Sequence, residues 1–254
     1  KLIKIETPHL VLLRMIVAGV GYFMVSDTRK FLADLDRKKL FRLILIGIII
    51  SIHWLCFYQS IKEYNSSSIA LVCLGTGPMF LIWIEYLIRK RKSIDWQPIL
   101  ISMIAIIGML LIAMGNKEED FQIMHFGSYE KSILYGIMAA LLASIFTLMN
   151  SEMSQSVSPF VLSFVEMISG AIVLSLYHIF LDNFSWLASI SWTDISFLMV
   201  LSLLCTCVPF LLSIYSLKKL EPFIVTLTVN LEPIYGLIFA ALIFQEYERF
   251  NLYF

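Results

Sequence analysis

Ionisable side chains inside long apolar segments are the residues of this sequence whose types and positions could do chemistry. His53 lies about 13 residues into one such segment and Glu232 about 10 residues into another, which puts both near mid-membrane if the segments cross a bilayer. Charge at that depth is costly, so each group is a candidate for a functional role. Glu232 could carry a proton or contact a substrate amine, and His53 is the other residue at that level that exchanges a proton near neutral pH.

Polar and aromatic residues surround these two groups at similar depth. Thr76 precedes Pro78, and Asn230 and Tyr235 flank Pro233, while Trp54 and Tyr58 share the segment of His53. A polar pocket with aromatic walls is expected from His53, Trp54, Tyr58, Thr76, Asn230, Glu232 and Tyr235. The alternatives are that Thr76 and the aromatic rings only pack, that His53 bonds a neighbouring helix, and that Glu232 is a permanently neutral brace for the proline break.

Arg14 and Glu166 also lie inside apolar segments. Their expected depths differ by about 10 Å at 1.5 Å per residue, which is too far for a simple ion pair. We therefore expect each to face the helix bundle with its own partners. Both a role near a gate and a purely structural anchoring role remain open for them.

Motifs for other kinds of chemistry are missing from the sequence. All of Cys56, Cys73, Cys205 and Cys207 lie in apolar segments, and Cys205-x-Cys207 lacks the companions of a metal site. There is no His-Glu-x-x-His, Gly-x-Ser-x-Gly or nucleotide-binding motif. We expect no catalytic residues, metal, cofactor or nucleic-acid partner. The expected partners are the lipid bilayer and a small-molecule substrate. Coupling to protons and formation of a homodimer remain open.

The segments that position these residues are transmembrane α-helices. Of the 254 residues, 59% are hydrophobic and 15% are charged, against about 25% charged in soluble domains. Apolar runs of about 20 residues match the thickness of a bilayer. An all-α integral membrane protein is predicted, with eight spans near 8–26, 40–62, 67–88, 97–115, 132–151, 159–182, 195–217 and 222–245. Pro78, Pro209 and Pro233 lie inside these runs and must kink or break their helices unless neighbours satisfy the freed carbonyls.

The distribution of Lys and Arg gives the orientation. If the 27–39 loop is cytoplasmic, twelve Lys and Arg residues lie on that side and six on the other, with Arg14 left inside a span. Both ends of the chain then lie outside the cytoplasm. We therefore expect one further helix before residue 1 and another after residue 254.

An internal repeat accompanies this topology. A gapless shift of 155 residues lays 41–96 over 196–251, which places Pro78 on Pro233, and a shift of 152 lays Arg14 on Glu166. We expect a single transmembrane domain of two repeats, 1–131 and 132–254, each lacking one helix of five. Because five is odd, the two repeats must have opposite orientations in the membrane.

The stretches 52–62, 67–80 and 215–236 resemble the EamA-type branch of the drug/metabolite transporter superfamily, whose members have ten helices. They show a helix, a polar corner and a second helix with a central proline, and Glu246 fits the Glu that follows in that family. The first half is a poorer fit, because Arg91 stands at the corresponding place. The resemblance implies inverted repeats around a central cavity and secondary transport of amino acids or other metabolites.

The expected function is secondary transport of a small neutral or zwitterionic metabolite, or of a drug-like solute, across the plasma (inner) membrane. Alternating access through the central cavity is expected, and proton coupling remains open. An intramembrane enzyme and a channel or other non-transporting membrane protein are the alternatives. The lone His and Glu would be a thin catalytic set, the broken helices argue against a scaffold, and saturable flux would argue against a channel.

Overall fold

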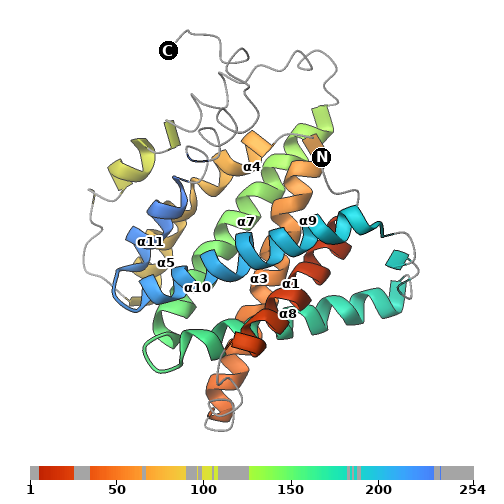
Figure 1. Ribbon diagram of the computed structural model, residues 1–254. Coiled ribbons are helices and arrows are strands. Elements are labelled where there is room, and N and C mark those ends of the chain that lie inside the picture. Colours follow the sequence, from red (N-terminus) through yellow and green to blue (C-terminus); the bar gives the residue numbers. More distant parts are fainter. Residues whose placement is uncertain are drawn as a thin grey trace. The chain divides into compact units, whose positions relative to one another are not determined.

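The computed structural model describes a helical membrane protein (Figure 1). It describes residues 6–25, 35–64, 67–89, 96, 99–104, 106–107, 126–181, 184, 186–187, 190–231 and 235. All regular structure within those residues is helical. Six helices in this part of the chain are long and apolar enough to cross a membrane. The predicted all-α polytopic architecture is therefore confirmed.

The helices follow the apolar segments. Their bounds are α1 (Thr7–Val25), α3 (Arg37–Tyr64), α4 (Ser67–Leu74), α5 (Gly77–Arg89), α7 (Phe126–Met153), α8 (Pro159–Leu181), α9 (Trp192–Ser202), the π-helical turn η3 (Leu203–Cys207), α10 (Val208–Leu217) and α11 (Pro222–Val229). Both α3 and α7 extend beyond the predicted runs, because helical hydrogen bonding continues into the polar turns that flank the hydrocarbon. Most of the predicted 97–115 span and the later part of the 222–245 span lie outside the described residues.

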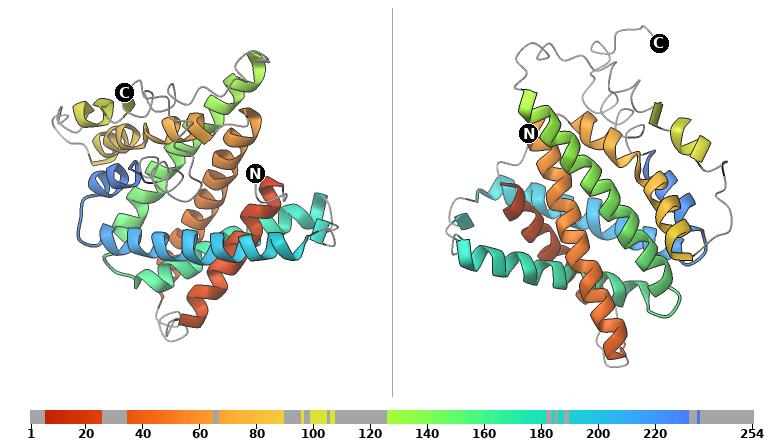
Figure 2. Two further views of the ribbon diagram at one scale, coloured as in Figure 1. Left: turned by 45° about the horizontal axis from the view of Figure 1, so that its top comes forward. Right: turned by 180° about the vertical axis from the view of Figure 1, so that it is seen from behind.

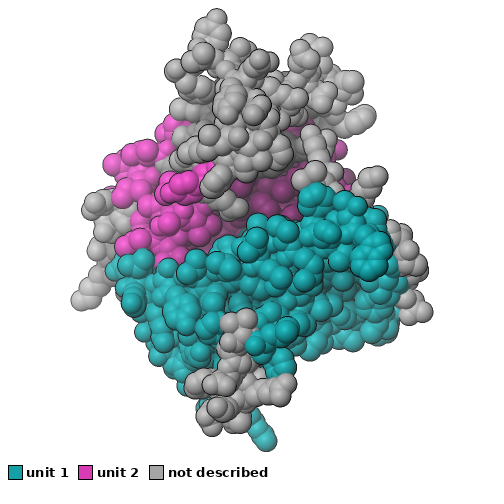
Figure 3. Space-filling model, in the orientation of Figure 1, with its two compact units in different colours: residues 1–55, 146–221 teal, residues 56–145, 222–254 magenta. Residues whose placement is uncertain are grey.

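The chain divides into two compact units (Figure 3). Unit 1 comprises residues 1–55 and 146–221, and unit 2 comprises 56–145 and 222–254. Each unit contains residues from both halves of the sequence. The boundaries between the units fall within α3 and α7, so each of these two helices contributes to both units. The predicted repeat boundaries at 1–131 and 132–254 concern the sequence rather than these units and stay a prediction.

Within unit 1, α1 packs along α8 and also crosses α9 (Figure 2). The rings of His9 and His178 are 4.7 Å apart, whereas those of Phe23 and Phe164, at the opposite ends of the same helices, are 5.6 Å apart. The two helices are therefore antiparallel. They are also the helices that the 152-residue shift superimposes. Antiparallel packing of equivalent helices is what two oppositely oriented repeats produce.

Glycines allow a close approach of α3 and α8 in unit 1. A Cβ added at Gly47 would lie 2.0 Å from Ser169 Oγ and 2.3 Å from the Glu166 carbonyl oxygen. A Cβ at Gly170 would lie 2.8 Å from the Gly47 carbonyl oxygen. Small residues at a helix contact are the usual device for tight packing in membranes, where burial of apolar surface gives no net drive. This contact brings the backbone of α3 against that of α8 at Glu166 and Gly170.

Apolar side chains also cover much of the described surface. Met24, Phe180 and Leu204 are 79%, 84% and 64% exposed, respectively. A soluble protein rarely leaves such large side chains in water in this number. Facing lipid they carry no such penalty, in agreement with a chain that spans the bilayer.

Candidate functional site

The first polar feature of unit 1 is the π-helical turn η3 between α9 and α10. Pro209 has no N–H, so the carbonyl of Cys205, four residues earlier, loses its α-helical donor. The backbone remains helical on both sides, with φ −75° and ψ −44° at Ser202 and φ −68° and ψ −54° at Val208. The helix therefore widens by one turn and continues to Leu217. Such π turns are frequent at functional sites.

Arg14 on α1 contacts this turn. Its Nε donates to Thr206 Oγ1, and its Nη2 lies 3.5 Å from the Cys205 carbonyl oxygen, whose α-helical donor Pro209 removes. Thr206 Oγ1 in turn donates to the Leu201 carbonyl at 2.9 Å. These groups hold the guanidinium against the wide turn. A cation within a membrane is stabilised by such contacts with backbone carbonyls and hydroxyls.

The same guanidinium stacks on Trp54 of α3. Arg14 Cζ lies 4.3 Å from the centroid of the indole ring, which is within the range of a cation–π interaction. His53, the next residue along α3, is buried and makes an edge-to-face contact with Phe146, with 5.3 Å between ring centroids. Two predicted cavity residues, His53 and Trp54, therefore lie in unit 1, and Trp54 is joined to Arg14.

Tyr22, two turns after Arg14 on α1, ties α1 to the end of the π turn. Its hydroxyl donates to the Cys207 carbonyl at 2.8 Å. Both Tyr22 and Thr206, the central residue of Cys205–Cys207, are buried. Tyrosine is suited to this position because its ring packs in the apolar bundle while its hydroxyl satisfies a backbone acceptor.

Glu166 is a second polar centre of unit 1 and is fully buried. Asn150 Nδ2 donates to Glu166 Oε2 at 3.3 Å. Within the described residues, Glu166 Oε1 and Asn150 Oδ1 have no hydrogen-bond partner. A buried carboxyl group with one free oxygen is costly as an isolated anion and is suited to holding a proton or a ligand donor. Arg14 and Glu166 thus contact different partners.

Unit 2 contains a second interrupted helix. The turn Gly75–Thr76 separates α4 from α5, and Pro78 is the second residue of α5. Thr76 Oγ1 donates to the Cys73 carbonyl at 2.6 Å. Asn230, the residue after α11, donates from Nδ2 to the Gly75 carbonyl at 3.4 Å. The side chains of Thr76 and Asn230 therefore donate hydrogen bonds to backbone carbonyls at this interruption.

Gly75 and Asn230 occupy equivalent positions under the 155-residue shift. A Cβ on Gly77 would lie 3.4 Å from Thr226 Cγ2, while Asn230 donates to Gly75, so the two segments run in opposite directions through this contact. Each of these residues therefore contacts the position that the shift makes equivalent to it. This contact in unit 2 repeats the antiparallel relation of α1 and α8 in unit 1.

The remaining predicted cavity residues are distributed unevenly. Tyr58 of unit 2 is half-buried and packs edge-on against Phe57, with 5.4 Å between ring centroids. Tyr235 is 55% exposed. Glu232 and Pro233 lie outside the described residues. Whether the unit 1 and unit 2 groups line one cavity stays a prediction.

Sequence reasoning missed Thr206, Asn150 and Tyr22. The signal for Thr206 was available, because Pro209 marks the carbonyl four residues earlier as one that needs another donor. Asn150 lies at the end of the predicted 132–151 span, and the structure places it in the last turns of α7. All four cysteines are free thiols. In the described part of the chain, no group of three or more His, Cys, Asp and Glu residues could hold a metal ion.

Comparisons with known proteins agree with this architecture. The sequence profile described as the EamA-like transporter family matches residues 1–114 and 130–253, once in each half of the chain. A solved structure described only as the crystal structure of a protein superimposes with a TM-score of 0.70 at 12% identity, over 94% of this chain and 79% of that one. This structural likeness shows the fold alone. No curated protein sequence matches the chain.

Proposed function

The chain belongs to the EamA-like transporter family, and from that premise we propose that it is a secondary transporter moving a small metabolite across the cytoplasmic membrane. It is a multi-pass membrane transporter of small solutes, and the family comprises transporters rather than enzymes. The finer proposal concerns substrate, mechanism and coupling. Every residue proposed for the site belongs to one chain, so the proposal does not depend on a homodimer.

The observation that supports the proposal most directly is a membrane helix modified by proline in each unit. Pro209 lacks the N–H that would bond the Cys205 carbonyl, and Arg14 contacts that carbonyl instead. In the turn before Pro78, the Gly75 carbonyl accepts a hydrogen bond from Asn230. Secondary transporters place substrate and ion sites at such discontinuities, where carbonyls and helix ends are available within the membrane. We propose that these turns rearrange as the carrier alternates between outward and inward access.

The proposed substrate is a neutral or zwitterionic solute such as an amino acid. The guanidinium of Arg14 favours a carboxylate, because its planar fork of N–H donors matches carboxylate geometry. Trp54 supplies an apolar wall beside it. Glu232 is proposed to face a substrate amine or a proton, with His53 as the second proton-exchanging group. A drug-like molecule with the same charge pattern would fit this proposal.

Uptake by proteoliposomes tests the substrate class. The purified chain is reconstituted and offered radiolabelled neutral, cationic and anionic amino acids in separate reactions. Saturable uptake of neutral amino acids above that of protein-free vesicles is expected. Selective uptake of the cationic or anionic amino acids would contradict the substrate class, and the absence of saturable flux for every solute would contradict the transporter assignment.

Glu232→Gln tests proton coupling, because the amide keeps the shape of the side chain but cannot titrate. Uptake driven by an imposed pH gradient is expected to be lost in this variant, whereas exchange of solute without a gradient persists. Glu221→Gln, in the exposed turn before α11, is the matched control and should behave like the unmodified chain. Unchanged gradient-driven uptake in Glu232→Gln would show that Glu232 is structural.

A further inference from the structure

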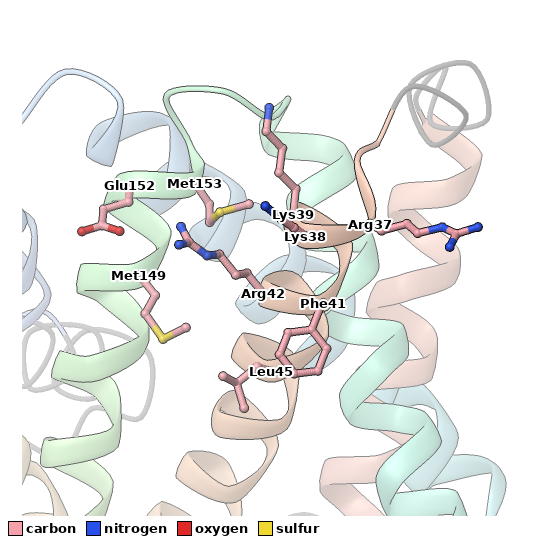
Figure 4. A pocket seen from close by; sticks show the side chains of 9 residues that line it. All are labelled: Arg37, Lys38, Lys39, Phe41, Arg42, Leu45, Met149, Glu152 and Met153. Atoms are coloured by element: carbon pink, nitrogen blue, oxygen red, sulfur yellow. The ribbon is translucent and has the colours of Figure 1, made fainter.

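A basic cleft lies in unit 1 between the first turns of α3 and the last turn of α7 (Figure 4). Its volume is about 860 Å³. Four cationic side chains and one acidic side chain line it together with four apolar ones: Arg37, Lys38, Lys39, Arg42, Glu152, Phe41, Leu45, Met149 and Met153. The cleft is separate from the Arg14 and Glu166 contacts and plays no part in the proposed transport step.

The two helices place the cleft at the border between hydrocarbon and headgroups. On α3, no charged residue occurs between Arg42 and Lys62, and 19 residues at 1.5 Å each span about 28 Å. On α7, residues 132–151 are likewise uncharged and end at Glu152. Because this length matches the hydrocarbon thickness, Arg42 and Glu152 mark one edge of it. Arg37, Lys38 and Lys39 then lie in the headgroup layer.

Among the described residues, the charges that line the cleft are not balanced. In the part of the chain that the structure describes, none of Arg37, Lys38, Lys39 and Arg42 forms an ion pair. Against four cations, the lining contains Glu152 as its acidic residue, which leaves a formal charge of +3. Figure 4 shows the Arg42 guanidinium directed from α3 toward α7. The cleft is therefore complementary to an anionic group.

The wall below the charges is apolar and open. Phe41 is 68% exposed and Leu45 is 41% exposed, while Met149 projects from α7 toward α3 (Figure 4). These side chains lie on the hydrocarbon side of the cationic group. An occupant that is anionic at one end and apolar at the other fits both parts. A soluble anion would leave the apolar wall uncovered.

We propose that this cleft binds an anionic phospholipid, with its phosphate on the Arg42 and Lys39 side and an acyl chain along Phe41, Leu45 and Met149. The positive-inside distribution assigns these residues to the cytoplasmic side, where basic clefts between transmembrane helices meet anionic headgroups. The bound lipid bridges α3 and α7 at this end of unit 1.

Native mass spectrometry of the detergent-solubilised chain tests the proposal. The protein is mixed with equal amounts of phosphatidylglycerol and phosphatidylcholine, and the retained lipid is counted. We expect phosphatidylglycerol to be retained at least about tenfold more often. Lys39→Gln combined with Arg42→Gln should abolish that preference. Lys218→Gln combined with Lys219→Gln removes two exposed cations of the same predicted side and should preserve it.

Two further measurements keep the test decisive. If the Lys39 and Arg42 double variant does not fold, Arg37→Gln combined with Lys38→Gln, on exposed residues of the first turn, should reduce the preference at least threefold. Glycerol phosphate added at millimolar concentration should not displace the lipid. The proposal is overturned by equal retention of the two lipids, by retained preference in the folded cleft variant, or by displacement with glycerol phosphate, which would indicate a site for soluble anions.

Discussion

Arg14 of α1 and the carbonyl of Cys205 in η3 lie 3.5 Å apart, although 191 residues separate them in the sequence. Pro209 explains the contact, because an amide at position 209 would otherwise donate to that carbonyl in an α-helix. The contact thus joins a membrane-embedded cation to a proline-modified turn. It is the point at which a change in the turn would move the charge.

Replacing Pro209 with alanine should weaken transport without unfolding the protein. The new N–H can bond the Cys205 carbonyl, so the π turn can revert to α geometry and rotate Thr206 away from Arg14. We expect initial uptake to fall by about tenfold or more, since small misplacements of binding groups have large effects on rate. The melting temperature should not decrease.

Pro159→Ala is the matched control for this change. Pro159 is the first residue of α8, where a proline N–H has no intrahelical partner to lose. Uptake should therefore stay near that of the unmodified chain. A Pro209→Ala variant that transports as well as Pro159→Ala would show that the π turn has no role in the cycle.

Thr206→Val should destabilise the folded protein. Valine keeps the shape of threonine but removes the oxygen that accepts from Arg14 Nε. Loss of a hydrogen bond to a charged group costs about 1.5–3 kcal/mol. Thermal unfolding in detergent measures the effect, with Thr228→Val as the control, because the exposed Thr228 hydroxyl donates to Ile224 of its own helix. Equal melting temperatures for the two variants would contradict the assigned contact.

Gly47→Ala should also be destabilising, through overpacking. Its new methyl group would lie 2.3 Å from the Glu166 carbonyl oxygen, a backbone atom that cannot rotate away. A cost of about 1–3 kcal/mol is expected for such a clash in a packed core. At Gly127, a Cβ meets nothing within 4 Å, so Gly127→Ala should unfold at or above the temperature of the unmodified chain. Tolerance of alanine at position 47 would refute the close packing of α3 on α8.

Two substitutions at Glu166 should show whether its hydrogen bond, rather than its packing, stabilises the fold. Glu166→Leu removes the acceptor of the Asn150 amide and should cost about 1–3 kcal/mol, because that amide is then buried without a partner. Glu166→Gln retains an acceptor oxygen and should cost less. The ratio of folded to unfolded protein in a denaturant series gives the change in unfolding free energy for each of the two variants. A leucine variant as stable as the glutamine variant would show that the Asn150 contact contributes nothing.

Much of the fold follows from apolar run length and proline position. The runs at 8–26, 159–182 and 195–217 correspond to α1, α8 and the α9–α10 helix within a few residues. Their ends are predictable because the thickness of the hydrocarbon fixes the number of apolar residues. The repeat shift predicts that α1 and α8 are related, and the structure packs these two helices antiparallel.

The side-chain partners were much less predictable. Depth along a helix singled out Arg14, Trp54 and Thr76 as candidates, but it does not give the direction in which each side chain points. Arg14 meets Trp54 and Thr206 because α1 crosses two other helices at one level, and that crossing depends on packing between segments far apart in sequence. The tight contact at Gly47 likewise depends on a partner helix that a single sequence does not identify.

Solute counterflow in proteoliposomes tests the central claim, alternating access, most directly. Vesicles containing the chain are loaded with a concentrated unlabelled neutral amino-acid mixture and diluted into a trace of the same mixture, radiolabelled. A carrier that alternates returns with labelled solute each time it releases unlabelled solute, so the label should transiently accumulate above its equilibrium level. Label that enters saturably but rises only to equilibrium, without an overshoot, would contradict alternating access.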